Sequence, residues 1–393
     1  MFGKTISAIG SAALTLSMTW AVPARAETYK VGILLPYSGV YAALGNEIEA
    51  GFRMALEDFA ADLGEHKIEI VREDDEVKPP VGLAKAKKLV LQDKVDVMMG
   101  IVSSGVLAGV RDFVHESKVP FIIANAGNDE MTSGNRCSPY LVRVSFSNSQ
   151  VNRPMGSWLF KQGKKKVWTF GPDYAAGRQQ IGAFADGYKA AGGTLAGQSF
   201  TPFGKTEDFG PFLTEAKAAN PDAIYAFYSG SEAIAFLKQY ANFGLNKTIP
   251  LYGAGFLTSV QHINAVGDGA DGVTSILHYV PSLDNPENKR FQTGIQKRIN
   301  TVGSEFGVQG YDAGHMLIAA IKATGGKKDQ LTAALPKAAF NGPRGPMKID
   351  PLTNNPIQNF YIYETKKSDK GIVYNVKETI PGVQDPVTGC KLN

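Results

Sequence analysis

Short, uninterrupted hydrophobic runs recur along the chain, and most of them lead into a segment with the 3.6-residue spacing of an amphipathic helix. In the first part of the chain the runs predict strands at 29–37, 66–72, 95–102 and 119–124. The spacing between them predicts helices at 48–59, 82–91 and 105–116. Continuous Val, Ile and Leu runs that alternate with helices are typical of a parallel sheet covered by helices on both faces.

The same alternation restarts further along the chain. It predicts strands at 166–170, 223–228, 250–253 and 273–280, and helices at 179–191, 232–243, 286–302 and 311–324. Two more strands are predicted near the C-terminus, at 359–365 and 371–378. No low-complexity linker separates the two sets, so the pattern predicts an α/β fold with two similar lobes.

The N-terminus has the features of a secretory signal peptide. Lys4 gives a positive start, residues 5–24 carry no charge, and Ala24-Arg25-Ala26 has the small-x-small pattern of a cleavage site. A membrane anchor is the alternative, but Gly, Ser and Pro residues interrupt the apolar run. Residues 1–26 are therefore predicted to be a signal peptide that is removed on export.

Composition excludes two further classes of protein. The 393 residues are 44% hydrophobic and 20% charged, which is too apolar for a disordered chain and enough for about two domains. The formal net charge is +4 and no basic block stands out, so nucleic acid is not an expected partner.

The only two cysteines are Cys137 and Cys390. In an oxidising compartment an even pair favours a disulfide, which would join the end of the chain to its middle. Two free thiols are the alternative. Two cysteines alone make neither a structural zinc site nor a CxxC redox motif.

Signatures of catalysis are scarce. The five histidines are scattered without a metal-chelating spacing, and no GxSxG nucleophile motif occurs. The GxGxxG match at 267–272 precedes a predicted strand, whereas a dinucleotide site follows one, so it is interpreted as a turn. The acidic run 73–76 is interpreted as the solvated end of a strand. The protein is expected not to be an enzyme and to need no cofactor or metal.

Polar residues follow several predicted strands, and ligands of open α/β sheets bind beyond these strand ends. Ser103 and Ser104 follow the third strand at the start of a helix, where they would either cap the helix or help to bind a carboxylate. Similar polar or aromatic ends occur at 125–128, 173–174 and 228–231. An aromatic residue at such an end would either clamp an apolar ligand or pack in the core.

Segments in this order resemble the periplasmic leucine/isoleucine/valine-binding protein family, the solute-binding subunits of ABC importers. The matching segments are VGILLPYSGVYAALG at 31–45, MMGIVSS at 98–104, PFIIANAG at 120–127, GPDYAAGRQ at 171–179, YGAGF at 252–256 and GVQGYDAGHMLIAAI at 307–321. The resemblance covers nearly the whole chain after the signal peptide.

The resemblance implies a type I periplasmic-binding fold. Two similar three-layer α/β lobes with mostly parallel sheets would be joined by three hinge crossovers, with the ligand in the cleft between them. Lobe 1 would comprise 28–143 and 279–361, and lobe 2 would comprise 144–278 and 362–393. The protein would be a periplasmic monomer that delivers a small organic acid to an ABC permease in the inner membrane.

The resemblance also implies roles for individual residues. Ser104 matches the serine that holds the ligand carboxylate, and Asn128 stands where a threonine supports it. Tyr174 matches an aromatic residue of lobe 2 over the ligand, and Ser229 or Tyr228 stands near another. The expected ligand-binding residues are Ser103, Ser104, Ala126, Gly127, Asn128, Tyr174, Tyr228, Ser229, Gly255, Phe256, Tyr41 and Arg178. Arg178 would either pair with the carboxylate or face solvent.

Gly255 is the largest departure from the family pattern. Amino-acid binders of the family place an acidic residue there to pair with the ligand ammonium, and a buried ammonium without a partner is costly. Together with the aromatic residues, glycine predicts an aromatic carboxylate, such as a benzoate or phenylpropenoate, as the ligand. A branched-chain amino acid or amide is the alternative, with Asp312 or Glu232 as its acidic partner. An exported NAD-dependent oxidoreductase is a remote one.

Overall fold

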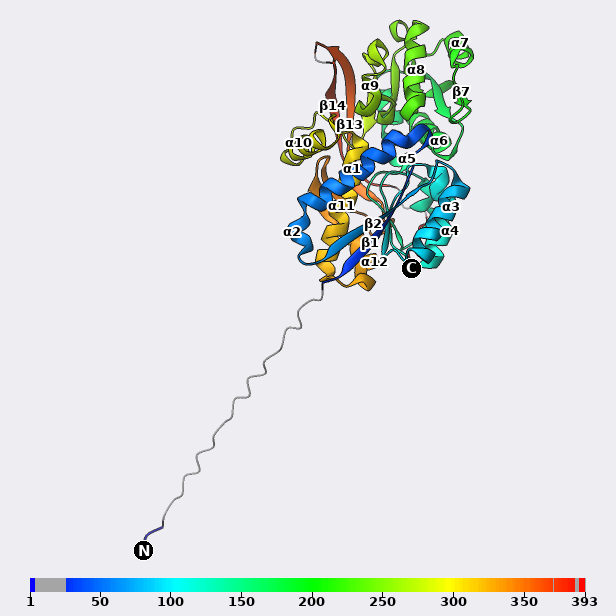
Figure 1. The fold of residues 1–393 in the computed structure, drawn as a ribbon. Coiled ribbons are helices and arrows are strands. Elements are labelled where there is room, and N and C mark those ends of the chain that lie inside the picture. Colours follow the sequence, from blue (N-terminus) through cyan, green and yellow to red (C-terminus); the bar gives the residue numbers. More distant parts are fainter. Residues whose placement is uncertain (4–25, 370, 386–388, 393) are drawn as a thin grey trace.

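The computed structural model describes residues 1–3, 26–369, 371–385 and 389–392 (Figure 1). These residues form two β-sheets, one of five strands and one of nine. The predicted signal peptide lies almost wholly outside the described residues and stays a prediction.

The five-stranded sheet is parallel and contains the first strands of the chain. Its order is β2-β1-β3-β4-β5, built from β1 (Thr28–Leu35), β2 (Lys67–Asp74), β3 (Val97–Gly100), β4 (Phe121–Ile123) and β5 (Leu141–Arg143). Side chains alternate between its faces, so Val31 and Ile33 join one apolar cluster and Leu34 joins another.

Helices cover both faces of this sheet. The first cluster takes in residues of α1 (Ala42–Asp58) and α11 (Glu305–Thr324), which pack against each other. The second takes in residues of α3 (Pro79–Lys87) and α4 (Ser104–Ser117). Figure 1 shows α11 on one side of β1 and β2, with α3 and α4 on the other. The smaller α2 (Ala60–Leu63) and α12 (Leu331–Ala334) lie near α11.

The nine-stranded sheet has a parallel part and an antiparallel part. The parallel strands are β6 (Lys166–Pro172), β7 (Thr194–Thr201), β8 (Ala223–Ala226), β9 (Leu251–Ala254) and β10 (Thr274–Leu277). The antiparallel strands are β11 (Ala339–Gly342), β12 (Gly345–Ile349), β13 (Pro356–Ser368) and β14 (Gly371–Val383). The helices of this half are α5 (Asn148–Lys161), α6 (Ala175–Ala190), α7 (Gly210–Ala218), α8 (Gly230–Asn242) and α9 (Val260–Ile263). The helix α10 (Pro286–Ile299) instead packs against α1 and α11.

The predicted fold class is confirmed: the protein is a mixed α/β molecule with two lobes and mostly parallel sheets. The proposed lobe boundaries stay a prediction. The strand β13 continues without a break through residues 361 and 362, where the resemblance places one crossover.

One helix begins earlier than its sequence pattern indicated. The predicted helix at 311–324 is α11, which starts at Glu305 and includes Gly307 and Gly310. Glycine suits the crossing with α1, because a Cβ at Gly310 would collide with the carbonyl oxygen of Ile48. Close approach of the two backbones therefore outweighs the low helix propensity of glycine here.

The disulfide expected from the two cysteines is present. It joins Cys137 and Cys390, whose Cα atoms are 5.5 Å apart. The bridge links the loop before β5 to the C-terminal segment and closes a loop with a sequence separation of 253 residues.

Candidate functional site

A cavity lies between the two sheets, at the carboxyl ends of their parallel strands. Six of the expected residues line it: Tyr41, Ser104, Gly127, Tyr174, Ser229 and Phe256. Five of them follow β3, β4, β6, β8 and β9, which explains why reasoning from strand ends could find them.

Several helices begin at this cavity. Ser104 and Asn148 are the first residues of α4 and α5, and Ala176 lies in the first turn of α6. Ser229 stands at the N-cap position of α8, and Phe306 is the second residue of α11. Helix N-termini carry partial positive charge and unpaired backbone N–H groups. Since no Lys or Arg belongs to the described lining, these helix starts give the cavity its positive character.

Ser103 and Ser104 have different roles. Ser103 is the N-cap of α4, and its Oγ accepts a hydrogen bond from the Val106 N–H at 3.5 Å. Ser104 lines the cavity, and its buried Oγ has no partner among the described residues. The Ser104 hydroxyl is therefore available to donate to a ligand.

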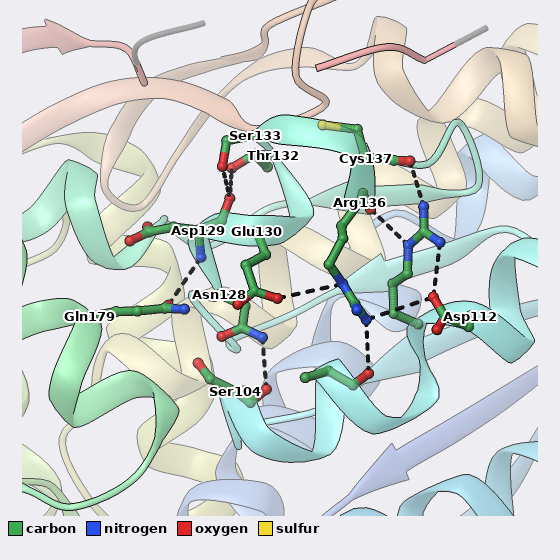
Figure 2. Close-up of polar contacts among 12 residues, drawn as sticks. Ser104, Asp112, Asn128, Asp129, Glu130, Thr132, Ser133, Arg136, Cys137 and Gln179 are labelled. Carbon is green, nitrogen blue, oxygen red and sulfur yellow. Dashed lines mark hydrogen bonds and ion pairs between the residues drawn. The ribbon is translucent and has the colours of Figure 1, made fainter. Parts of the chain in front are cut away.

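Asn128 braces Ser104 from outside the cavity. Its Nδ2 donates to the carbonyl oxygen of Ser104 at 2.9 Å, as Figure 2 shows. Its own carbonyl oxygen accepts from the buried guanidinium of Arg143 at 2.6 Å. The supporting position that the resemblance gives to Asn128 matches these contacts, although its side chain does not line the cavity.

Aromatic rings form most of the apolar wall. Phe146 and Phe256 pack with ring centroids 5.0 Å apart, and Tyr174 stacks on Phe203 at 4.0 Å. The hydroxyl oxygens of Tyr41 and Tyr174 lie 3.0 Å apart. Burial raises the pKa of both tyrosines above its ordinary value, so both stay neutral. Phe227 and Phe306 complete this wall.

The sequence matches the model of the family described as periplasmic binding protein over residues 28–371. The chain belongs to this family. It is 32% identical over 374 residues to "Leu/Ile/Val-binding protein homolog 6" of Brucella melitensis, with 93% of this chain and 95% of that protein covered. The resemblance seen in the sequence is thereby confirmed.

Two solved structures are similar along nearly their whole length. A solute-binding protein of an ABC transporter from R. palustris, in complex with benzoate, has a TM-score of 0.86 and 38% identity, covering 93% of this chain and 100% of its own. A second, from Rhodopseudomonas palustris BisB5 in complex with 3,4-dihydroxybenzoic acid, has a TM-score of 0.86 and 34% identity, covering 91% and 99%. This periplasmic binding protein is thus an ABC-type solute-binding protein.

Three other expected residues have contacts that keep them out of the wall. Arg178 is 58% exposed and pairs with Asp173 at 2.6 Å, which matches its solvent-facing alternative. Tyr228 points into the core of its own lobe, where its hydroxyl meets that of Thr201 at 3.0 Å. Ala126 is buried behind the wall, and its N–H donates to the carbonyl oxygen of Ile101 at 3.0 Å.

Gly255 also lies outside the wall, which its neighbour Phe256 reaches instead. A Cβ at this position would come within 2.6 Å of the Leu277 Cβ and of the Tyr363 hydroxyl. An acidic side chain therefore has no room there. The side chains of Leu277 and Tyr363 fill the space that a side chain at this position would occupy.

The two acidic residues considered as substitutes do not line the cavity. Asp312 forms a buried ion pair with Arg344, with 2.8 Å between Oδ2 and Nε. Glu232 accepts a hydrogen bond from the Gly204 N–H at 2.8 Å, and burial raises its pKa to about 7. Among the described residues, no carboxylate belongs to the lining.

Nine described lining residues were absent from the expected set: five lie in helices, and four, Val102, Asn125, Phe146 and Phe227, follow strands. The missed side chains include three amides, Asn125, Asn148 and Gln180, and the phenylalanines Phe146, Phe227 and Phe306. Leu44, Val102 and Ala176 complete the lining.

Within the described ranges, no helix combines the length and apolar character that a membrane-spanning helix needs.

Proposed function

We propose that this protein captures an aromatic carboxylate between its two lobes and delivers it to an ABC permease. The observation that carries the proposal is a cavity with aromatic walls, several helix N-termini and no described carboxylate in its lining. Such a site attracts an anion and a flat apolar ring, and it offers nothing to neutralise a cation.

The start of α4 is the proposed carboxylate site. Helix N-termini bind anions because their first N–H groups have no intrahelical acceptor. The unpartnered Ser104 hydroxyl adds a donor at the same place. Gly127 lets a ligand come close to the backbone of the neighbouring strand end, since it has no side chain.

The aromatic wall is the proposed ring site. Tyr41 comes from the start of α1 on the five-stranded sheet, and Tyr174 from the start of α6 on the nine-stranded sheet. A ring held between them and the pair Phe146–Phe256 would gain edge or offset contacts of about 0.5–1.5 kcal/mol each. The complexes of the two similar proteins with benzoate and 3,4-dihydroxybenzoic acid support this ligand class.

A branched-chain amino acid is the second candidate. The name of the Brucella relative favours it, and Glu232 is the described carboxylate whose charge acts on both Tyr41 and Tyr174. Two features oppose it. The partial positive charge of the helix N-termini disfavours a buried ammonium group, and there is no room at position 255 for an acidic side chain that would pair with one.

The remaining expectations belong to the same proposal. The protein would be exported by its signal peptide, act in the periplasm as a monomer without a cofactor, and carry out no catalysis. Closure of the lobes around the ligand would be the signal that the permease recognises.

Calorimetric titration of the refolded, ligand-stripped protein tests the proposal. We expect binding of benzoate or its hydroxylated derivatives and no heat with leucine, isoleucine or valine. A ligand at 100 times its dissociation constant adds about 2.7 kcal/mol of stability, so a thermal shift checks the result independently. Binding of leucine without any aromatic acid would refute the aromatic ligand and support the second candidate.

A further inference from the structure

Asn148 presents a carbonyl oxygen of fixed orientation to the cavity. Its Nδ2 donates to Gln179 Oε1 at 2.8 Å, and the same oxygen accepts from the Asp129 N–H at 3.2 Å. Figure 2 shows Gln179 reaching from its helix toward Asp129. A backbone N–H can only donate, so Gln179 must turn its oxygen to that place, and Asn148 must turn its Nδ2 toward it.

The remaining oxygen of Asn148 lies in the wall. Asn148 is fully buried, and its Oδ1 has no donor among the described residues. A Cβ added to Gly127, which also lines the cavity, would collide with this oxygen. A buried acceptor without a donor is unfavourable, so the site calls for a ligand that donates a hydrogen bond here.

Gln180 offers a hydrogen-bond donor, whereas Asn148 offers an acceptor. Asn152 Nδ2 donates to the backbone carbonyl oxygen of Asn148 at 2.7 Å and to Gln180 Oε1 at 3.0 Å, while Asn152 Oδ1 accepts from the Tyr225 hydroxyl. A backbone carbonyl can only accept, which fixes the amide of Asn152 and then that of Gln180. Gln180 Nε2 is left as a donor with no acceptor among the described residues.

Asn148 and Gln180 line the same cavity, and Asn152 bonds to both residues, to the backbone carbonyl oxygen of Asn148 and to the side-chain oxygen of Gln180. Of the groups that a small organic acid can carry, a hydroxyl both donates and accepts. A carboxylate only accepts and would face Asn148 Oδ1. An ammonium only donates and would face the N–H groups of Gln180. An unsubstituted ring satisfies neither amide.

We propose that the preferred ligand is a hydroxylated aromatic carboxylate, whose hydroxyl donates to Asn148 Oδ1 and accepts from Gln180 Nε2. This inference rests on the proposed function and narrows its ligand class. Gln179 and Asn152 act as positioning residues, because they hold the two amides in these orientations without lining the cavity.

Calorimetry of the ligand-stripped full chain tests the inference with matched ligands. Each of 2-, 3- and 4-hydroxybenzoate is compared with the methylbenzoate of the same position, which has a similar size, and with benzoate. We expect at least one hydroxybenzoate to bind about tenfold or more tightly than its methyl counterpart. Equal affinities within every pair would overturn the hydroxyl inference and leave the aromatic ligand standing. If no aromatic acid binds and leucine does bind, the proposed function itself would be overturned.

Variants test whether the preference for a hydroxylated ligand depends on the side-chain amides of Asn148 and Gln180. Gln180→Met removes the donor, and Gln179→Met removes the acceptor that orients Asn148. Both are expected to bring the hydroxyl-to-methyl affinity ratio down to about one to threefold, and this ratio does not depend on general loss of stability. Gln239→Met is the matched control, because Gln239 bonds to Phe209 and Glu207 away from the cavity. A hydroxyl-to-methyl ratio that persists in both Gln179→Met and Gln180→Met would contradict the assigned contacts.

Discussion

The hydroxyl oxygens of Tyr41 and Tyr174 meet at 3.0 Å and connect the helix start after β1 with the helix start after β6. The contact joins the two lobes at the wall of the cavity. In the lobe closure proposed above, opening would break this contact, so the contact would stabilise the closed conformation.

Tyr41→Phe or Tyr174→Phe is therefore expected to weaken ligand binding. Loss of one hydrogen bond of about 1 kcal/mol corresponds to an increase in Kd of about fivefold. The double variant is expected to match each single one, because either change removes the same contact. Tyr188→Phe is the control, since the Tyr188 hydroxyl bonds to Lys164 O and does not line the cavity. Additive effects of the two cavity variants would show that the pair is not coupled.

The two adjacent serines allow binding to be separated from stability. Ser104→Ala removes the unpartnered cavity hydroxyl and is expected to raise the Kd for an aromatic carboxylate about tenfold, with little loss of stability. Ser103→Ala removes the N-cap of α4 and is expected to lower the free energy of unfolding by about 1 kcal/mol. Titration and urea unfolding of both variants measure the difference. Weaker binding in Ser103→Ala together with lower stability in Ser104→Ala would contradict the roles assigned to the two residues.

Glu232 makes stability depend on pH. Burial raises its pKa from 4.5 to about 7, so the folded protein holds the proton more tightly than the unfolded chain. The stabilising contribution of the neutral form is complete below the unfolded pKa and is lost as pH rises through about 7. Glu232→Gln is expected to unfold like the parent at about pH 4 and to be more stable than the parent at about pH 8.

Urea unfolding at both pH values checks this expectation. Glu207→Gln, at an exposed position, serves as the control and is expected to change stability by less than about 0.5 kcal/mol. A difference between Glu232→Gln and the parent that is the same at both pH values would contradict the role of burial.

The crossing of α1 and α11 should not tolerate a larger residue at Gly310. Gly310→Ala places a methyl group against the Ile48 carbonyl oxygen and is expected to cost about 1–3 kcal/mol of stability. Gly182→Ala lies in α6 with open space around its Cβ, so the helix should gain about 0.5–1 kcal/mol. Thermal unfolding compares the two, and a stable Gly310→Ala protein would mean that the helices can separate at no cost.

The sequence predicted the parallel part of the fold because buried parallel strands are continuous apolar runs. It missed β7 (Thr194–Thr201), which has only two buried residues and carries no such run. It also missed α5, which begins with polar residues and contains Pro154. These elements depend on packing against the neighbouring helix and sheet more than on their local pattern.

The site divides in the same way. Strand ends are visible in a sequence, and this is why Ser104, Gly127 and Tyr174 could be named. Asn148 and Gln180 lie in helices, and only folding brings α5 and α6 to the same wall. The capping pair Ser147 and Gln150 was the available signal for the start of α5.

The helix starts around the cavity also bear on how the proposed ligand would be released. Those of α4 and α11 belong with the five-stranded sheet, while those of α5, α6 and α8 belong with the other half. Neither half alone carries all of the helix N-termini that surround the cavity. Their partial positive charge comes from backbone N–H groups, so a change of protonation does not remove it. For the proposed carboxylate ligand, separating the halves would disperse the attraction by geometry alone, so release would require hinge motion and no chemical change in the ligand or the protein.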